Sequence, residues 1–223
     1  MSKNKLKKKI TLAVLTILLA LPSYMSAQDS DFGNWIMYFG NKKLNNNWNI
    51  HNEIQYRNYN AIGDLEQLLL RTGLGYTFNE GKSNILFGYG YILSENYLGN
   101  SDDKETVNEH RIFQQFITTQ NVGSVKLNHR YRFEQRFVED DFKMRLRYFL
   151  GLNIPFNKTS PYYFSAYNEI FLNTKSAVFD RDRLYGGIGY KINDNMRLEL
   201  GYMNQFFETT SSDQFNIMTF VTF

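Results

Sequence analysis

Apolar and polar residues alternate one by one along most of the chain. The clearest case is the segment 125–137, where Tyr131 would share one face of an extended strand with apolar neighbours while Arg130 and Arg132 share the other. Strand side chains alternate with a period of two, so this spacing predicts one apolar and one charged face. Similar runs recur from Trp48 to the last residue, separated by residues typical of turns. The pattern predicts an all-β chain.

The length of these runs distinguishes a membrane protein from a soluble one. They cover about 10 to 14 residues, whereas soluble strands average five or six. Tilted strands of this length cross a bilayer, and a closed barrel gives them an apolar outer face without an unpaired edge. We therefore predict a transmembrane antiparallel up-and-down β-barrel of about 10 to 12 strands. Segment 107–119 has no clear phase, because both of its faces mix polar and apolar residues, and residues 94–106 are expected to form a long surface loop.

The number of strands is harder to fix. Eleven runs are present if residues 32–40 are counted, but bacterial single-chain barrels have an even number of strands. If the last strand ends in the periplasm, the acidic or long loops all fall outside and the short turns fall inside, which favours ten strands from Trp48 onward. Residues 32–40 are then expected as a periplasmic or lumenal extension, or as one strand of a pair whose twelfth member is not recognised.

The N-terminus has the pattern of a secretory signal. Residues 1–27 contain five lysines, then twelve apolar residues from Ile10 to Leu21, then a small and polar segment with a cleavage site after Ala27. The mature barrel would be residues 28–223, with 20 basic against 22 acidic residues and a formal net charge of −2. Net charge therefore gives no reason to expect a nucleic-acid partner. The absence of cysteine excludes a lipid-modified cysteine and disulfides.

Composition and the last residues fit the same prediction. Aromatic residues make up 17% of the chain although its mean hydropathy is −0.45, as expected when half of each strand faces a polar lumen. Residues 215–223 alternate and end on Phe223. This ending resembles the last strand of bacterial outer-membrane barrels, and the resemblance implies that Phe223 is an insertion signal for the barrel-insertion machinery.

Several short motifs resemble a known family. They are Tyr56-Arg57, Gly75-Tyr76, Gly88-Tyr89-Gly90-Tyr91, Glu109-His110-Arg111, Arg130-Tyr131-Arg132-Phe133-Glu134, Arg145-Leu146-Arg147, Gly189-Tyr190 and Gly201-Tyr202. With them, the mature chain resembles barrels known as domain of unknown function 2490, which are common in Bacteroidetes-like bacteria. The resemblance implies a location in the bacterial outer membrane and brings no established activity or site.

The predicted lumen is rich in charge. The alternation places these nine arginines inward: Arg57, Arg71, Arg130, Arg132, Arg136, Arg145, Arg147, Arg183 and Arg197. Four acids also face inward: Glu53, Glu134, Glu169 and Glu199. With Lys126, Lys143 and Lys191, twelve cations oppose four anions. One interpretation is a paired network that fills a narrow barrel, since buried charges persist only when paired. The other is a hydrated basic lumen with weak anion selectivity.

Three functions remain open at this point. We expect a narrow, basic-lumen pore or transport-associated barrel; the alternatives are a structural or partner-binding barrel with a plugged lumen, and a hydrolase at the outer rim. His110, with Asp102, Asp103 or Asp182 as partners, is the one histidine placed for hydrolysis, but no nucleophile is fixed, so we expect no enzyme. The acidic loops predict a solvated rim, with an oxygen-ligand calcium site as the alternative. No cofactor or metal is expected; partners would be outer-membrane lipid, lipopolysaccharide and the insertion machinery.

Overall fold

The computed structural model describes residues 32–223 with the exception of residues 100 and 176, so the predicted signal sequence lies outside the described residues. No helix in this part of the chain is long and apolar enough to cross a membrane. The described residues form the strands β1 (Gly33–Lys43), β2 (Trp48–Asn58), β3 (Leu65–Phe78), β4 (Ser83–Tyr97), β5 (Lys104–Val122), β6 (Val125–Val138), β7 (Asp141–Pro155), β8 (Tyr162–Asn173), β9 (Phe179–Lys191), β10 (Met196–Phe206) and β11 (Ser211–Thr222).

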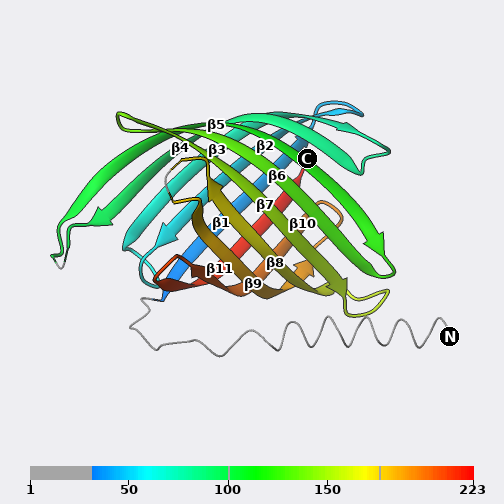
Figure 1. The fold of residues 1–223 in the computed structure, drawn as a ribbon. Helices are drawn as coiled ribbons and strands as arrows, with labels where there is room; N and C mark the ends of the chain where they lie inside the picture. Colours follow the sequence, from blue (N-terminus) through cyan, green and yellow to red (C-terminus); the bar gives the residue numbers. More distant parts are fainter. Residues whose placement is uncertain (1–31, 100, 176) are drawn as a thin grey trace, which may run out of the picture. The chain divides into compact units, whose positions relative to one another are not determined.

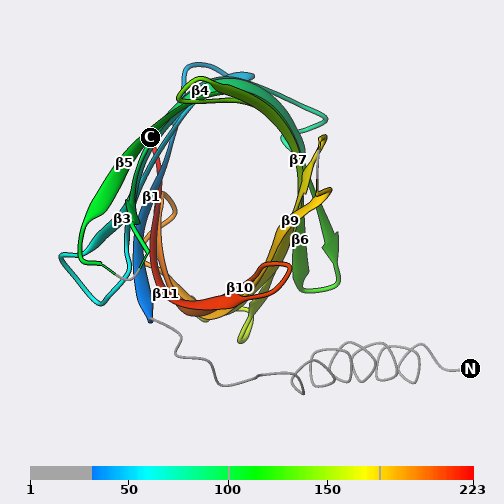
Figure 2. The ribbon, with the colours of Figure 1, turned by 60° about the vertical axis from the view of Figure 1, so that its left-hand side comes forward.

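The eleven strands form one closed barrel (Figure 1). Each strand pairs antiparallel with the next along the chain, and β1 pairs with β11 to close the ring, which Figure 2 shows in a view through the barrel. Closure satisfies the backbone groups of the first and last strands, which would otherwise be unpaired edges. The predicted all-β barrel is confirmed.

The closing pair is parallel, and this resolves the strand count. The register runs from Gly33 opposite Gln214 to Asn41 opposite Thr222. An odd number of strands linked by consecutive hairpins leaves the first and last strands pointing the same way, so they can close the ring only in parallel. Both expectations for residues 32–40 were therefore wrong: the segment is a strand of the wall, and the described residues contain no twelfth strand. The expectation of an even number of strands was the reason for the incorrect strand count.

Two ends of the barrel can be distinguished by their connections. The end called here the turn end carries the connections 44–47, 79–82, 123–124, 156–161 and 192–195, together with Phe223. The opposite end, called the loop end, carries the connections 59–64, 98–103, 139–140, 174–178 and 207–210. The parallel pair places the start of β1 at the loop end.

The prediction of a long loop over residues 94–106 was wrong. Strand β4 continues to Tyr97 and β5 begins at Lys104, with Glu95 opposite Thr106, so only residues 98–103 connect them. Polar residues without alternation still form a ladder here, because the hairpin β4–β5 extends beyond its neighbours (Figure 1). In such an extension neither face has to be apolar.

The two faces of the wall differ as the alternation predicts. Large apolar side chains point outward, and Ile85 and Phe87 are 54% and 60% exposed. Charged side chains point inward, and Glu134 is 0% exposed although it carries a carboxylate. The protein is therefore apolar outside and charged inside, the reverse of a soluble domain.

Inward-facing glycines make room for large rings on neighbouring strands. A side chain at Gly189 would collide with the ring of Tyr163, and one at Gly187 would collide with the hydroxyl of Tyr185. Both rings are almost fully buried in the lumen. The inner glycines of the sequence therefore serve close packing of aromatic rings across the sheet.

Candidate functional site

The candidate site is the charged interior of the barrel. Arg57, Arg71, Arg130, Arg132, Arg147, Arg183, Arg197, Glu53, Glu169 and Glu199 line a cavity in the lumen. Glu134, Arg145 and Arg136 lie on the same inner face, beyond this cavity toward the loop end, and bond to other inner residues. All thirteen of these residues lie on the inner side of the wall, and the structure further shows which of the charges meet.

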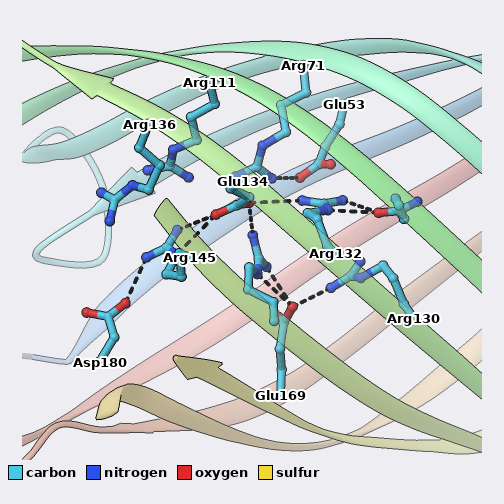
Figure 3. A network of polar contacts seen from close by, with 12 residues as sticks. Glu53, Arg71, Arg111, Arg130, Arg132, Glu134, Arg136, Arg145, Glu169 and Asp180 are labelled. Carbon is cyan, nitrogen blue, oxygen red and sulfur yellow. Dashed lines mark hydrogen bonds and ion pairs between the residues drawn. The ribbon is translucent and has the colours of Figure 1, made fainter. Parts of the chain in front are cut away.

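The centre of the interior is Glu134 on β6, as Figure 3 shows. Arg145 and Arg147 on β7 each donate to its carboxylate at 2.7 Å, one to each oxygen. The guanidinium of Arg132 lies 3.6 Å away. One fully buried carboxylate therefore faces three guanidinium groups. Such a charge is tolerated in a dry interior only because its partners are fixed around it.

A second carboxylate, Glu169 on β8, extends the network along the wall. Its Oε1 accepts hydrogen bonds from Arg147 Nη2 and from Arg130 Nη2, each at 2.7 Å. Arg147 therefore links Glu134 to Glu169, and the three strands β6, β7 and β8 are tied together through one guanidinium. Planar guanidinium groups suit this role because they present several donors in a fixed geometry.

Further pairs join the network at its edges. Arg71 on β3 donates to Glu53 on β2, and Arg145 reaches Asp180 on β9 at 2.8 Å. Glu109 on β5 accepts from Arg136 at 2.6 Å and also pairs with Arg111. Ion pairs thus connect β5 through β9 within the loop-end half of the barrel, with a separate pair on β2 and β3.

Aromatic and aliphatic side chains fill the space between these ion pairs. Leu69, Ile92, Phe113 and Phe171 point inward at this level and are at most 1% exposed. The guanidinium of Arg147 lies 4.3 Å from the centre of the Phe171 ring, in cation–π geometry. Trp35 is stacked in the same way, because Arg57 approaches its ring to 3.7 Å. Charged and apolar side chains together fill the cross-section of the lumen toward the loop end.

A cavity opens into the lumen from the turn end. It has a volume of about 790 Å³ and extends from Ser124, Pro155 and Thr222 at the turn end to Arg57 and Arg183, which lie toward the loop ends of β2 and β9. Its lining contains nine arginine or lysine side chains and three glutamates. The lumen is therefore a charged basin with one filled end.

Some charges of the site cannot be found by alternation. Glu109 and Arg111 lie in the segment without a clear phase, and Asp180 lies where the sequence indicates a loop although it belongs to β9. These two acids pair with Arg111 and Arg181, so as many cations as acids are added and the expected excess of cations stays the same. Lys143, on the inner side of its strand, is 52% exposed at the loop end and pairs with Asp141 at 3.4 Å, so it is not part of the network.

The loop-end rim is less uniformly solvated than expected. Asp64 accepts hydrogen bonds from Lys104 and, at 2.7 Å, from the hydroxyl of Tyr97, which fastens the loop 59–64 to the β4–β5 hairpin. Partial burial would raise the pKa of Asp64, but the hydrogen bonds from Lys104 and Tyr97 outweigh it and lower the pKa below its ordinary value. Among the described residues, no group of three or more metal-ligating side chains is gathered together.

The histidines occupy three different surroundings. His110 lies on the outer wall with its Nδ1 2.5 Å from the hydroxyl of Tyr89. His129 is on the same outer face beside Tyr148, at 2.9 Å. His51 lines the cavity and lies 3.4 Å from Glu53. Phe223, the predicted insertion signal, ends the chain at the turn end with its side chain 64% exposed.

A comparison with protein families decides the classification. The family described as protein of unknown function (DUF2490) matches residues 32–216. The chain belongs to this family. An uncharacterized protein of Methylorubrum extorquens is 31% identical to this DUF2490 protein over 171 residues, which cover 72% of each chain. No solved structure matches it. The inferred resemblance is therefore confirmed for nearly the whole barrel, and the function has to be argued from the lumen.

Proposed function

We propose that this DUF2490 protein is an outer-membrane barrel whose lumen is closed to diffusion, and that it acts as a binding or structural barrel and not as an open pore. The observation that carries the proposal is the buried network around Glu134. Hydrated pores need a continuous polar path, whereas here Glu134 is 0% exposed and the apolar side chains at its level are at most 1% exposed. Of the functions open from the sequence, the plugged barrel fits this geometry best.

The outer face supports a membrane location. Aromatic side chains form a series of contacts from Trp48 on β2 through Tyr76 and Phe116 to Tyr131 and Tyr148 on β7, with neighbouring ring centres 5.0 to 6.5 Å apart. Aromatic girdles of this kind lie at the lipid–water interface of outer-membrane barrels. Outer-membrane lipid and lipopolysaccharide are the proposed surroundings, and the barrel-insertion machinery the proposed assembly partner.

Planar-bilayer recording tests the closed lumen. We expect no stepwise conductance from purified wild-type protein, once its folded state is verified by the difference in gel mobility between heated and unheated samples. A variant with Glu134→Ala, Arg145→Ala and Arg147→Ala removes the centre of the network and is expected to conduct. Regular steps from the wild type, above all anion-selective ones, would favour the basic pore instead.

We also propose that the protein is not a hydrolase. Among the described residues, no carboxylate oxygen lies within 4.0 Å of a ring nitrogen of His110, and the ring packs beside the aromatic residues Tyr89 and Tyr91. A general base needs a partner that orients it and a nucleophile within reach. We expect peptide and phospholipid hydrolysis at the level of the blank for both the wild type and His110→Ala. Hydrolysis by the wild type that His110→Ala abolishes would refute this.

A further inference from the structure

The cavity that opens at the turn end is lined by more cations than the carboxylates of the ion-pair network can pair. Nine of its lining side chains are cationic and three are acidic. Among the described residues, Lys126 and Lys191 have no carboxylate within 4.0 Å, and Arg197 has only Glu199, at 3.4 Å. Lys126 lies within electrostatic reach of both Lys191 and Arg197, so three like charges crowd one mouth of the barrel. Like charges that converge in a concave site attract a counter-ion.

Deeper in the cavity, some arginines have no carboxylate partner, and at least one N–H donor has no acceptor. Arg57 and Arg183 bond to the amide oxygens of Gln55 and Gln205 and not to carboxylates. The Arg132 side chain is 2% exposed, lines the cavity, and its Nη1 has no hydrogen-bond partner. A buried donor without an acceptor is costly, and in a native structure it commonly marks a place where a ligand or an ordered water binds.

The opposite wall of the cavity is apolar. Phe39 on β1 and Phe220 on β11 stack with ring centres 4.9 Å apart, and Met37 and Met218 lie beside them. In the closed ring, β6 with its Lys126 stands five strands away from both β1 and β11. Arg197 on the neighbouring strand β10 lies 3.8 Å from the centre of the Phe220 ring, and Lys191 is on β9. An entering molecule would therefore meet an aromatic surface that Arg197 and Lys191 border and that Lys126 faces from across the lumen.

We propose that this cavity binds a small organic anion with an aromatic or aliphatic body, which enters from the turn end. The charged group meets Lys126, Lys191 and Arg197, and the apolar body lies against Phe39 and Phe220. The volume of about 790 Å³ is within the range of small-molecule sites. This inference rests on the proposed closed lumen, because a filled far end makes the cavity a binding site and not a passage.

Calorimetric titration of the full-length barrel in phosphatidylcholine nanodiscs tests the site, with empty nanodiscs as the blank. The probes are naphthalene-1-sulfonate and the cation 1-naphthylmethylammonium, which share the ring system and differ in charge. We expect saturable binding of the sulfonate alone, weakened by added salt because the attraction is ionic. Inorganic phosphate, which lacks the apolar body, should bind at least about tenfold more weakly than the sulfonate.

Two double variants locate the binding. Lys126→Gln with Lys191→Gln removes two mouth cations and should weaken sulfonate binding by about tenfold or more, since each 1.4 kcal/mol of lost attraction is a factor of ten. Lys42→Gln with Lys158→Gln removes two exposed cations at the same end that do not line the cavity, and should leave the affinity unchanged. No binding to the wild type, or equal loss in both double variants, would overturn the site. Conductance by the wild type would instead overturn the closed lumen, so the two failures are distinguishable.

Discussion

Replacing Glu134 by glutamine is the most direct perturbation of this barrel. The substitution keeps the shape of the side chain and removes its charge, while Arg132, Arg145 and Arg147 stay in place around it. One carbonyl oxygen of the amide can still accept a hydrogen bond, but the amide nitrogen would face guanidinium donors. The network would then hold three cations around a neutral group in a place that water does not reach.

The expected cost follows from this geometry. Removing one partner of a buried ion pair leaves an uncompensated charge and typically destabilises a protein by about 3–5 kcal/mol. Glu134 has two partners at 2.7 Å and is 0% exposed, whereas its glutamine substitute keeps one acceptor. Arg147 also keeps Glu169 at 2.7 Å. We therefore expect Glu134→Gln to lower the free energy of unfolding by about 3 kcal/mol, near the lower limit of that range.

Urea unfolding in lipid vesicles measures this change, with the fluorescence of Trp35 and Trp48 as the signal. Glu80→Gln is the matched control, because Glu80 pairs with Lys82 at 3.0 Å but its side chain is 83% exposed. An exposed pair of this kind contributes little, so the control should unfold like the wild type. If Glu134→Gln unfolds within about 1 kcal/mol of the control, the network is hydrated or does not hold the wall together, and the lumen has no dry barrier at this level.

Three further predictions concern the wall and the rim. Gly189→Ala should destabilise the barrel by about 1–3 kcal/mol, because the added methyl group collides with the ring of Tyr163. Gly186→Ala on the same strand should not, because nothing lies within 4 Å of its added methyl group. The loss of the folded gel band on heating compares the two variants, and equal stability would show that Gly189 is not needed for close packing. Ile36 lies opposite Ile217 in the closing pair, so the double variant Ile36→Cys with Ile217→Cys should form a disulfide on oxidation. The double variant Ile36→Cys with Phe215→Cys should not. The reverse result would reject the parallel register. The pKa of Asp64 in the folded protein is below its ordinary value of 3.8, so the stabilisation by its contact with Lys104 should be present above about pH 4 and lost at lower pH. The rate of proteolysis in the loop 98–103, measured as a function of pH, tests this. Asp64→Asn should make the loop susceptible to proteolysis at every pH.

The sequence predicts the all-β class and the inward or outward direction of most side chains, but it does not predict how the first and last strands pair. Alternation fixes which side chains of β6 face inward, because strand geometry leaves two choices and only one gives an apolar outer face. The same logic fails for β1, where Trp35 and Met37 face the lumen and the strand has no charged side to set its phase. Its partner β11 is almost the whole chain away, so no local signal indicates a parallel pair. The loop boundary at Tyr97 is missed because a ladder that extends beyond its neighbouring strands needs no alternation.

The candidate site shows a similar limit. Alternation predicts that Glu134 and Arg147 point inward, but their contact depends on how far each side chain reaches across the lumen. Glu109 is missed because its strand mixes polar and apolar residues on both faces, and Asp180 because it follows a stretch without periodicity. The sequence thus supplies the charges, and the pairing that decides between a plug and a passage comes from the register and tilt of the strands.

Barrel size explains why both a plug and a basin occur in one lumen. The interior of an eight-stranded barrel is just wide enough to be filled by side chains, and the diameter grows with each added strand. Eleven strands leave more space than ordinary side chains can fill, and at the loop-end half the gap is bridged by long arginines such as Arg145 and Arg147 that meet shared carboxylates. At the turn end, Lys126 and Lys191 have no such carboxylate among the described residues, and the space stays open. The acid positions along the strands, and not the number of cations, therefore determine where this barrel is closed.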